Sequence, residues 1–457
     1  MSLCVSWKRK KALDCDFTKG NITKNLLKFS LPLMAGNLLQ QLYNIADTLI
    51  VGRYLGENAL AAVGSSYTLM VFLTSILSGL CMGSSAYFSM QFGKKDDDRL
   101  KKGIFMSFII IGIISLAINI AAFTGIDAII WFMRVKGAIV KELMREYLLC
   151  IFSGIPAVFL YNYFANLLRS VGNSMIPLVF LGISAGLNIA LDLLFVIGFK
   201  QGVNGAAVAT VIAQYVSGVG ITVYYAVKCS ELHIKKVHMR WEGSILKEIT
   251  GLSVLTCVQQ SVMNFGILMV QGLVNSFGTV VMAAFAAAVK IDSFAYSPVQ
   301  DFGNAFSTYV AQNYGAGKMD RIKEGMKKAV LLVFVFCMAI SGAVYVFGSR
   351  LMSLFVDSSN TDVIAVGAEY LKIEGAFYFG IGLLFIFYGY FRAVGKPSVS
   401  VALTVISLGT RVALAYMLAA FLKVGVIGIW AAVPVGWLLA DIAGAVFLKK
   451  HRKTYTS

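Results

Sequence analysis

The sequence predicts an all-α polytopic membrane protein with twelve transmembrane helices in two six-helix lobes, which are related by pseudo-two-fold symmetry. Three observations support this fold class: the composition, the placement of basic residues and an internal repeat. Of the 457 residues, 58% are hydrophobic and only 14% are charged, whereas soluble globular domains carry about 25% charged residues. At about 20 apolar residues per crossing, the chain has room for roughly twelve helices.

Apolar segments separated by turn signals define these helices along the chain. The first six expected helices lie near 26–52, 59–92, 103–125, 141–168, 176–198 and 204–228. The second six lie near 246–275, 281–313, 325–348, 362–392, 397–421 and 427–448. Several of these segments exceed about 20 residues, so we expect tilted helices or helices that extend beyond the bilayer.

Basic residues predict the orientation of the helices. If the N-terminus is cytoplasmic, the even-numbered connections are cytoplasmic too, and together with both termini they hold most of the 40 Lys and Arg residues. Cytoplasmic connections of membrane proteins are enriched in Lys and Arg in this way. We therefore expect a multi-pass protein of the plasma membrane with both termini in the cytoplasm. The orientation of the helices in the membrane therefore accounts for the net charge of +17. Because the charge has this explanation, we expect no nucleic-acid partner.

An internal repeat divides the chain into two halves. Three motif pairs recur at nearly the same offset: "GKKDDDR" (93–99) with "GAGKMDR" (315–321), "LRSVGN" (168–173) with "FRAVGK" (391–396), and "GVNGAAVA" (202–209) with "GVIGIWAA" (425–432). We expect an N-terminal lobe over 1–228, a cytoplasmic linker over 229–247 and a C-terminal lobe over 248–457. Because six is even, both halves enter the membrane from the same side, an arrangement found in transporters.

Several function classes lack their motifs. The sequence has no GxxxxGK[ST] phosphate loop and no HExxH, and these are signatures of nucleotide and zinc-protease sites. His233, His238 and His451 all fall in segments expected to be cytoplasmic. The seven cysteines include no CxxC pair, so a zinc site or disulfide framework is not indicated. We expect neither an enzyme nor a nucleotide-driven pump, and no cofactor other than a coupling ion.

Four oxygen-bearing side chains in the first half are expected at one depth in the membrane. Asp47, Asp192 and Thr210 each lie about six residues from the outer end of a helix, roughly 9 Å at 1.5 Å per residue. Asn188 is one turn from Asp192 on the same helix face. Intramembrane carboxylates are costly and usually functional, and neutral oxygens complete the shell of a hard cation. We predict a Na⁺ or H⁺ site here, although hydrogen-bonded structural roles remain the alternative.

The second half carries a different set of intramembrane polar residues. Its members are Lys290, Asp292, Glu369, Glu374 and Arg411. Lys290 and Asp292 are two residues apart and cannot face each other within a helix, whereas Glu374 and Arg411 could match in depth. Structural ion pairing and substrate contact are both open for this set.

Neutral polar residues near Asp47 suggest a substrate cavity. Gln40, Tyr43 and Asn44 lie on the helix of Asp47, and Asn162 and Asn166 form another polar i, i+4 pair in the fourth helix. Such groups, with nearby aromatic and Met side chains, suit a bulky amphipathic cation. Hydrogen bonding between or within helices is the alternative for each residue.

Two GxxxG spacings predict close helix contacts. They are Gly79–Gly83 in the second expected helix and Gly182–Gly186 in the fifth. Small residues at this spacing let two helix backbones approach closely in a membrane.

Four motifs together carry a resemblance to a known family. They are "LLQQLYNIADTLIVGRYLG" in the first helix, "LRSVGNSMIP" before the fifth, "NIALDLLFVIG" within it and "AQNYGAGK" after the eighth. From about residue 20 to 450, the chain resembles the multidrug and toxic compound extrusion (MATE) family, in particular its prokaryotic branch with aspartates in the first and fifth helices.

The resemblance implies two lobes around a central cleft and export of organic cations in exchange for Na⁺ or H⁺. It implies that Asp47, Asn188, Asp192 and Thr210 form the coupling site, and it matches Pro32 to a helix-1 proline associated with bending. Other branches use an acidic residue in the seventh helix, and "LSVLTCVQQSVMNFGILMVQG" has none. A flippase for lipid-linked oligosaccharides, from the same wider superfamily, is the alternative function; its cavity should hold more arginines for pyrophosphate.

Overall fold

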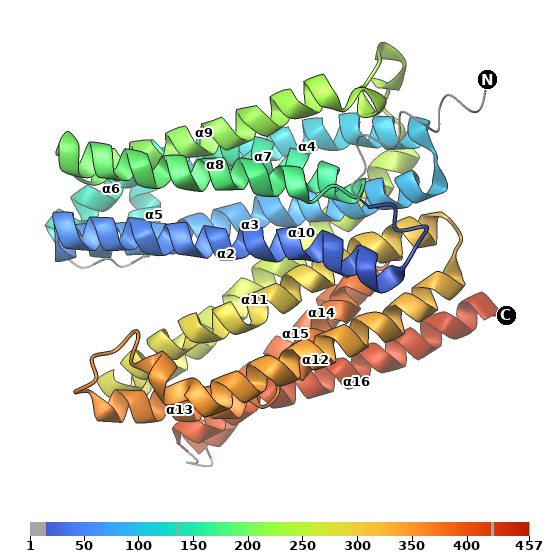
Figure 1. Ribbon diagram of the computed structural model, residues 1–457. Coiled ribbons are helices and arrows are strands. Elements are labelled where there is room, and N and C mark those ends of the chain that lie inside the picture. Colours follow the sequence, from blue (N-terminus) through green and yellow to red (C-terminus); the bar gives the residue numbers. More distant parts are fainter. Residues whose placement is uncertain (1–14, 134, 136, 422–424, 457) are drawn as a thin grey trace. The chain divides into compact units, whose positions relative to one another are not determined.

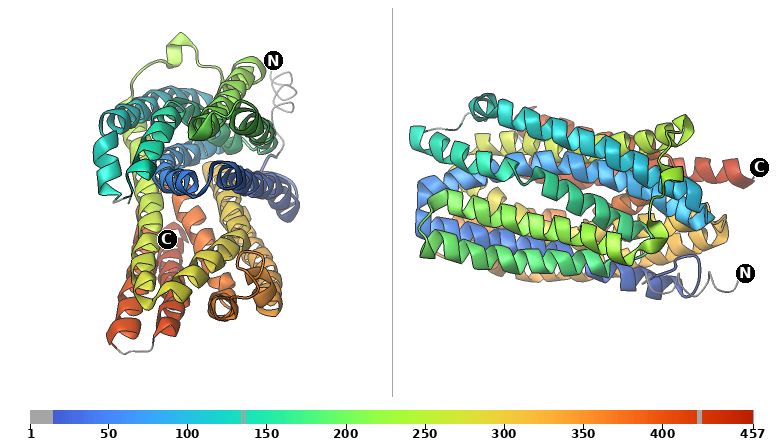
Figure 2. Two further views of the ribbon diagram at one scale, coloured as in Figure 1. Left: turned by 90° about the vertical axis from the view of Figure 1, so that its left-hand side faces the viewer. Right: turned by 90° about the horizontal axis from the view of Figure 1, so that it is seen from above.

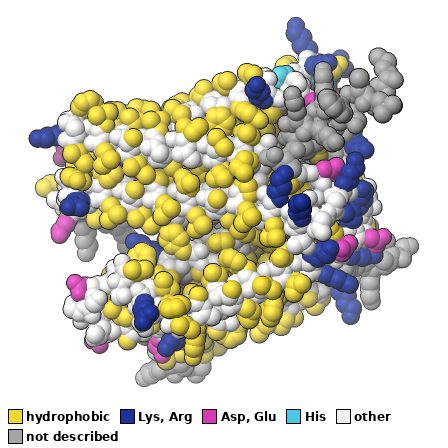
Figure 3. All heavy atoms as spheres, viewed as in Figure 1, with side chains coloured by type: hydrophobic (Ala, Val, Ile, Leu, Met, Phe, Trp, Pro, Cys, Tyr) yellow, Lys and Arg dark blue, Asp and Glu magenta, His cyan; other side chains and the backbone are white. Residues whose placement is uncertain are grey.

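The computed structural model describes residues 15–133, 135, 137–421 and 425–456 (Figure 1). Throughout that part the regular structure is helical, and no strand occurs in it, as the composition predicts. The basic N-terminal cluster lies outside the described residues. Figure 3 shows hydrophobic side chains covering the flanks of the helices and charged side chains gathered towards the helix ends, as expected for helices that cross a bilayer.

The chain divides into two compact units. The first comprises Met1–Gly20 and Leu27–Cys257, and the second comprises Asn21–Leu26 and Val258–Ser457. The division after Cys257 falls inside helix α10 (Gly243–Val274), whereas we expected a linker over 229–247. That stretch contains the short 3-10 helices η3 (Ser230–Leu232) and η4 (Lys236–His238).

Long helices that run side by side build the first unit (Figure 2). In chain order they are α2 (Ile22–Leu55), α3 (Glu57–Lys94), α4 (Asp97–Thr124), α5 (Ile126–Phe132), α6 (Ala138–Phe152), α7 (Ile155–Ser170), α8 (Met175–Asp192), the π-helical η2 (Leu193–Gly198) and α9 (Gly202–Lys228). Local sequence fixes their ends: at the start of α4, the Asp96 carboxylate accepts a hydrogen bond from the Arg99 backbone N–H at 3.0 Å, which caps the helix.

The second unit follows the same plan. After the last part of α10 come the 3-10 turn η5 (Asn275–Phe277), α11 (Thr279–Gly315), α12 (Met319–Met352), α13 (Thr361–Gly375), α14 (Tyr378–Ala393), α15 (Pro397–Tyr416), the π-helical η6 (Met417–Phe421) and α16 (Val426–Thr456).

Most of the expected crossings are present as single helices, and two are broken. Within the described residues, nine helices are long and apolar enough to cross a membrane, and two bent pairs raise the number to eleven. The pairs are α6–α7, bent by 47°, and α13–α14, bent by 51°, in place of the continuous helices expected near 141–168 and 362–392. Helix α2, with 34 residues and several polar side chains, is the remaining candidate for the twelve crossings.

The backbone repeats as well as the sequence. Eight of the residues with positive φ form four pairs at about the offset of the sequence repeat: Gly56 and Gly278, Lys95 and Gly317, Gly172 and Gly395, Gly202 and Gly425. A left-handed conformation is costly for residues with a Cβ atom, so these positions are specific turning points of the chain. Each unit therefore reverses direction at the same places.

The first GxxxG spacing makes the predicted helix contact, and the second does not. A Cβ atom on Gly79 would lie 2.6 Å from Cys257 Cα, and one on Gly83 would clash with Ser253 Cα, so α3 and α10 touch through their backbones. The hydroxyls of Ser84 and Ser253 share a hydrogen bond of 2.8 Å beside this contact. The prediction for Gly182–Gly186 is wrong, because no atom in the described part of the chain lies within 4 Å of a Cβ atom at either position.

Candidate functional site

Three helices of the first unit bring the four predicted oxygen-bearing side chains into one region. Asp47 comes from α2, Asn188 and Asp192 from α8, and Thr210 from α9. The Asp47 and Asp192 carboxyl groups are close enough for the charge of one to act on the other. The Asn188 side-chain NH₂ donates to the Thr210 hydroxyl at 3.3 Å. The depth argument therefore gives the correct spatial grouping.

Three of the four carboxylate oxygens of this group have no hydrogen-bond partner among the described residues. Asp192 is fully buried and Asn188 is 2% exposed. Within the described residues, both carboxylate oxygens of Asp192, one of Asp47 and the side-chain oxygen of Asn188 have no hydrogen-bond partner. Buried polar atoms without hydrogen-bond partners cost free energy. A bound cation or a proton would reduce this cost, so the cluster is a candidate ion site.

A tyrosine from another helix faces both aspartates. Tyr147, on α6, is 7% exposed, and the charges of Asp47 and Asp192 both act on its hydroxyl group. The negative charge of Asp47 also acts on the hydroxyl group of Tyr43, one turn earlier in α2. Tyrosine hydroxyls can donate or accept hydrogen bonds but carry no positive charge. These two tyrosines therefore do not compensate the negative charge of the aspartates.

An apolar layer lies one turn beyond the cluster on each contributing helix. Ile50 and Val51 follow Asp47, Val196 follows Asp192, and Ala206 and Ala207 precede Thr210; all are buried and belong to one hydrophobic cluster. Since these residues lie between the polar group and the helix ends that we expect to face outward, the layer separates the carboxylates from that side.

Helix α8 changes its hydrogen-bond pattern immediately after Asp192. The next six residues form the π-helical η2, and the π-helical η6 follows α15 at the corresponding place in the second unit. Short π-helical turns are rare and often occur at functional sites. The hydropathy pattern gave no signal for either turn.

The donor set fits a hard cation or a proton. Carboxylate, amide and hydroxyl oxygens are the ligands that hard cations prefer, and a carboxylate can equally take a proton. Transition-metal ligands are not assembled here, because the described residues contain no group of three or more His, Cys, Asp and Glu side chains suited to a metal ion. The residues present therefore fit Na⁺ or H⁺.

The neutral residues proposed for a cavity behave in two ways. Asn44, on α2, donates to the Tyr67 hydroxyl of α3 at 3.4 Å, while Gln40 is exposed and Tyr43 is half-buried. Asn162 and Asn166 instead donate to backbone carbonyls one turn earlier in α7, at 2.9 and 2.8 Å. Their NH₂ groups therefore form hydrogen bonds within their own helix, which is the structural alternative. Their side-chain oxygens are the atoms left to contact a substrate.

In the second unit, three of the five predicted charged residues come together. Asp292 on α11 is 6% exposed and Glu374, at the end of α13, is 1% exposed. The charge of Arg411, on α15, acts on both carboxyl groups. Tyr370 and Tyr378 surround the same carboxyl groups. This cluster lies beside the bend between α13 and α14.

The other two predicted residues lie apart from this cluster. Lys290 and Glu369 are exposed. Each sits on the same helix as a cluster member, Lys290 two residues before Asp292 and Glu369 five residues before Glu374. Neither spacing places the two side chains on one helix face.

Sequence reasoning missed a further buried carboxylate. Asp441, on α16, is 8% exposed, and one of its oxygens has no hydrogen-bond partner in the described part of the chain. A Cβ atom on Gly380 of α14 would lie 3.6 Å from the other oxygen. The signal was available, because an aspartate in an apolar helix is expensive wherever it occurs.

Comparisons with known proteins agree with this architecture. The family model described as MatE matches residues 32–194 and 254–417. The chain is 30% identical over 393 residues to the probable multidrug resistance protein YpnP of Bacillus subtilis, covering 86% of this chain and 87% of the relative. It is 26% identical over 418 residues to the probable multidrug resistance protein NorM of Thermotoga maritima, covering 90% and 88%.

Solved structures share the fold. A structure described as the outward-facing conformation of a multidrug resistance MATE family transporter of the MOP superfamily superposes with a TM-score of 0.91 at 24% identity, covering 96% of this chain and 98% of that chain. The family model matches two segments of similar length, one in each half, as the internal repeat predicts. The chain therefore belongs to the MatE family, the multidrug and toxic compound extrusion family that its sequence resembles.

Proposed function

We propose that the protein is a secondary-active multidrug transporter that exports organic, mostly cationic compounds in exchange for Na⁺ or H⁺. The family and the names of its relatives, probable multidrug resistance proteins, support efflux of small molecules across a lipid bilayer. The observation that carries the coupling is the fully buried Asp192, with two unpartnered oxygens, next to Asp47. The basic connections support a plasma-membrane location with cytoplasmic termini.

The proposed cycle uses the first-unit cluster as the ion site. In the outward-facing state, Na⁺ or H⁺ reaches Asp47 and Asp192 and neutralises them, with Asn188 and Thr210 supplying neutral oxygens. Neutralisation alters the electrostatics around α2, where Gln40, Tyr43 and Asn44 are the proposed drug contacts, and the drug leaves. The ion can drive this exchange only through different affinities for the two states of the transporter.

The apolar layer beyond the cluster sets a condition on this cycle. Residues such as Val51 and Val196 are buried, so an ion arriving from outside has to cross them. Transfer of an ion through an apolar layer is very costly. The layer must therefore open for loading, which ties ion entry to a conformational change.

The test is efflux of a fluorescent organic cation from vesicles, with Na⁺ and pH gradients imposed separately. Wild type is compared with Asp47→Asn and Asp192→Asn, and Asp127→Asn is the matched control because Asp127 is an exposed acid paired with Arg145. We expect one gradient to drive efflux by wild type and the control, and neither cluster variant to respond. If both cluster variants pump like wild type, the first cluster is structural and coupling belongs to Asp292 and Glu374.

A further inference from the structure

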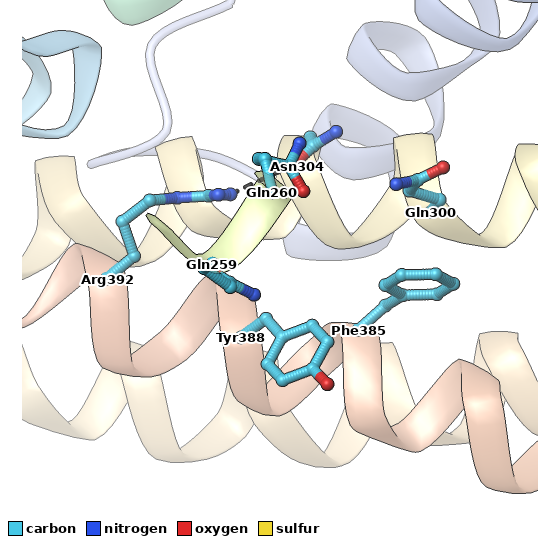
Figure 4. A pocket seen from close by; sticks show the side chains of 7 residues that line it. All are labelled: Gln259, Gln260, Gln300, Asn304, Phe385, Tyr388 and Arg392. Atoms are coloured by element: carbon cyan, nitrogen blue, oxygen red, sulfur yellow. Dashed lines mark hydrogen bonds between the residues drawn. The ribbon is translucent and has the colours of Figure 1, made fainter. Parts of the chain in front are cut away.

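A cavity of the second unit is too small for an organic ligand. Its volume of about 20 Å³ gives room for one water molecule. The residues that line it are Gln259, Gln260, Gln300, Asn304, Phe385, Tyr388 and Arg392 (Figure 4). A larger partner cannot bind there, whereas the connection between α9 and α10 in the first unit presents an open surface.

This connection lies at a membrane surface. Helices α9 and α10 are both long and apolar enough to cross a bilayer, so the chain between them leaves the membrane and enters it again. Residues 235–241, "KKVHMRW", contain the short helix η4, and we call them the η4 segment. They combine basic and apolar side chains within seven positions.

The η4 segment is fastened to the start of α4. His238 is buried, and its Nε2 lies 3.9 Å from a carboxylate oxygen of Asp98. The backbone N–H of Lys235 donates to His238 Nδ1 at 3.0 Å. The rings of Trp241 and Phe105 lie edge to face with their centroids 6.2 Å apart. The segment therefore has a defined position against α4.

The contact with Phe105 places Trp241 at the membrane boundary. Lys101 and Lys102 are the last charged residues of α4, and Phe105 follows them by one turn, where the helix becomes continuously apolar. Tryptophan is enriched at this depth in membrane proteins, because its ring is apolar and its N–H is polar. The rest of the η4 segment then lies at the level of the lipid head groups.

Three apolar side chains of the η4 segment are exposed. Val237, Met239 and Trp241 are between 50% and 58% exposed, although they belong to a connection and not to a membrane-spanning helix. Moving such surface from water into the membrane interface is favourable. The exposed apolar side chains therefore favour contact with lipid.

Three basic side chains alternate with the apolar ones. Lys235, Lys236 and Arg240 are exposed, and none of them takes part in the ion pairs formed among the described residues. The nearby acids already have a basic partner, since Lys102 lies 2.7 Å from Asp98 and 3.4 Å from Glu242. The three cations are therefore available to an external anion.

We propose that the η4 segment binds anionic phospholipids of the membrane leaflet that it faces. Its three basic side chains bind the lipid phosphates, which are good acceptors for charged N–H donors, and its three apolar side chains enter the interface beside them. Basic groups next to a membrane attract anionic lipids in this way. The partner is the bilayer and not a transported compound, so this proposal does not depend on the proposed efflux function.

Quenching of tryptophan fluorescence by brominated lipids tests the contact. Purified protein is placed in phosphatidylcholine vesicles that contain rising fractions of brominated phosphatidylglycerol or, separately, of brominated phosphatidylcholine. The chain has five tryptophans, so the signal of Trp241 is the difference between wild type and Trp241→Phe, which keeps an aromatic ring beside Phe105. We expect half-quenching of Trp241 at an at least about 5-fold lower fraction of the anionic lipid, the effect of one basic residue near an anionic surface.

Three results would overturn the proposal. If neither brominated lipid quenches Trp241, the η4 segment does not reach the bilayer. If both lipids quench it at the same fraction, the segment does not recognise anionic head groups. If inorganic phosphate at constant ionic strength removes the preference, the basic side chains bind free phosphate and not lipid. Because quenching requires no transport, each result holds whether or not the protein exports drugs.

Charge variants assign the preference to the η4 segment. In the triple variant Lys235→Gln, Lys236→Gln and Arg240→Gln we expect Trp241 to be quenched equally by both lipids. Should the triple variant fail to fold, Arg240→Gln alone should lower the preference at least about 2-fold. A folded variant of either kind that keeps the preference of wild type contradicts the assignment.

The matched control removes the same charge from another helix start. Lys323→Gln, Lys327→Gln and Lys328→Gln lie in the first turns of α12, and Lys323 and Lys328 have acidic partners at 3.2 and 2.6 Å. We expect this variant to keep the preference of Trp241 for the anionic lipid. An equal loss in the control would show that only the net charge of the protein matters, and the proposal would be wrong.

Discussion

In each unit two acidic side chains lie close together within the helices, but the charges around the two pairs differ. In the first unit, Asp192 lies near Asp47, and no Lys or Arg is among the described groups whose charges act on it. In the second unit, Asp292 and Glu374 share the field of Arg411. A buried carboxylate next to a built-in cation is already compensated, whereas one without it needs an external cation or a proton. The comparison therefore favours the first unit as the ion-responsive one.

The largest expected difference comes from neutralising one acid in each unit. Asp192→Asn should abolish gradient-driven efflux, because the variant can no longer gain a compensating cation. Asp292→Asn should keep a gradient response, because Arg411 still compensates Glu374. Efflux from vesicles with equal amounts of inserted protein measures both. If Asp292→Asn loses the gradient response and Asp192→Asn keeps it, the first unit is not the ion-responsive one.

Removing the built-in cation should instead affect stability. Arg411→Gln leaves two buried carboxyl groups without their compensating charge, and we expect the free energy of unfolding to fall by about 3 kcal/mol. Adding Glu374→Gln should recover part of this loss, which a double-mutant cycle measures. Thermal melting of the purified protein is the measurement, with the exposed Arg350→Gln as control. An equal loss of stability in Arg350→Gln would show that Arg411 does not stabilise the protein by compensating the two carboxyl groups.

A smaller effect is expected from a neutral ligand of the first cluster. Thr210→Val keeps the shape of the side chain but deletes the hydroxyl that accepts from Asn188. A hydrogen bond contributes about 1 kcal/mol, so we expect the half-activating concentration of the coupling ion to rise about 5-fold. Thr222→Val is the matched control on the same helix, since the Thr222 hydroxyl donates to the Gly218 carbonyl one turn earlier in α9. An unchanged half-activating concentration would exclude Thr210 from the site.

The smallest effect is expected from the charged residues that lie outside the second cluster. Lys290→Met and Glu369→Gln replace exposed side chains, and such changes usually alter stability by no more than about 0.5 kcal/mol. Melting temperature and efflux should both match wild type. A large loss with either variant would extend the second cluster beyond Asp292, Glu374 and Arg411.

The hydropathy pattern predicts the helical fold, and the internal repeat predicts the division into two halves. Both predictions are possible because each pattern extends over whole segments and does not depend on a single residue. The grouping of Asp47 with Asp192 was also predictable, since helix geometry converts sequence position into depth. The breaks between α6 and α7 and between α13 and α14 were not, because an apolar segment reads the same whether it is straight or bent. Arg392 is 4% exposed and donates to Ser307 and Asn304 of α11, and its position near a helix end in the sequence does not reveal this packing.

The paired left-handed turns have an evolutionary consequence. Gly172 and Gly395, or Gly202 and Gly425, constrain the path of the backbone and not the chemistry of the side chains. After a duplication, each copy could retain these corners and still exchange almost every interior residue. One unit can therefore hold two acids without a neighbouring arginine while the other holds an arginine beside its two acids, and neither arrangement requires a new fold.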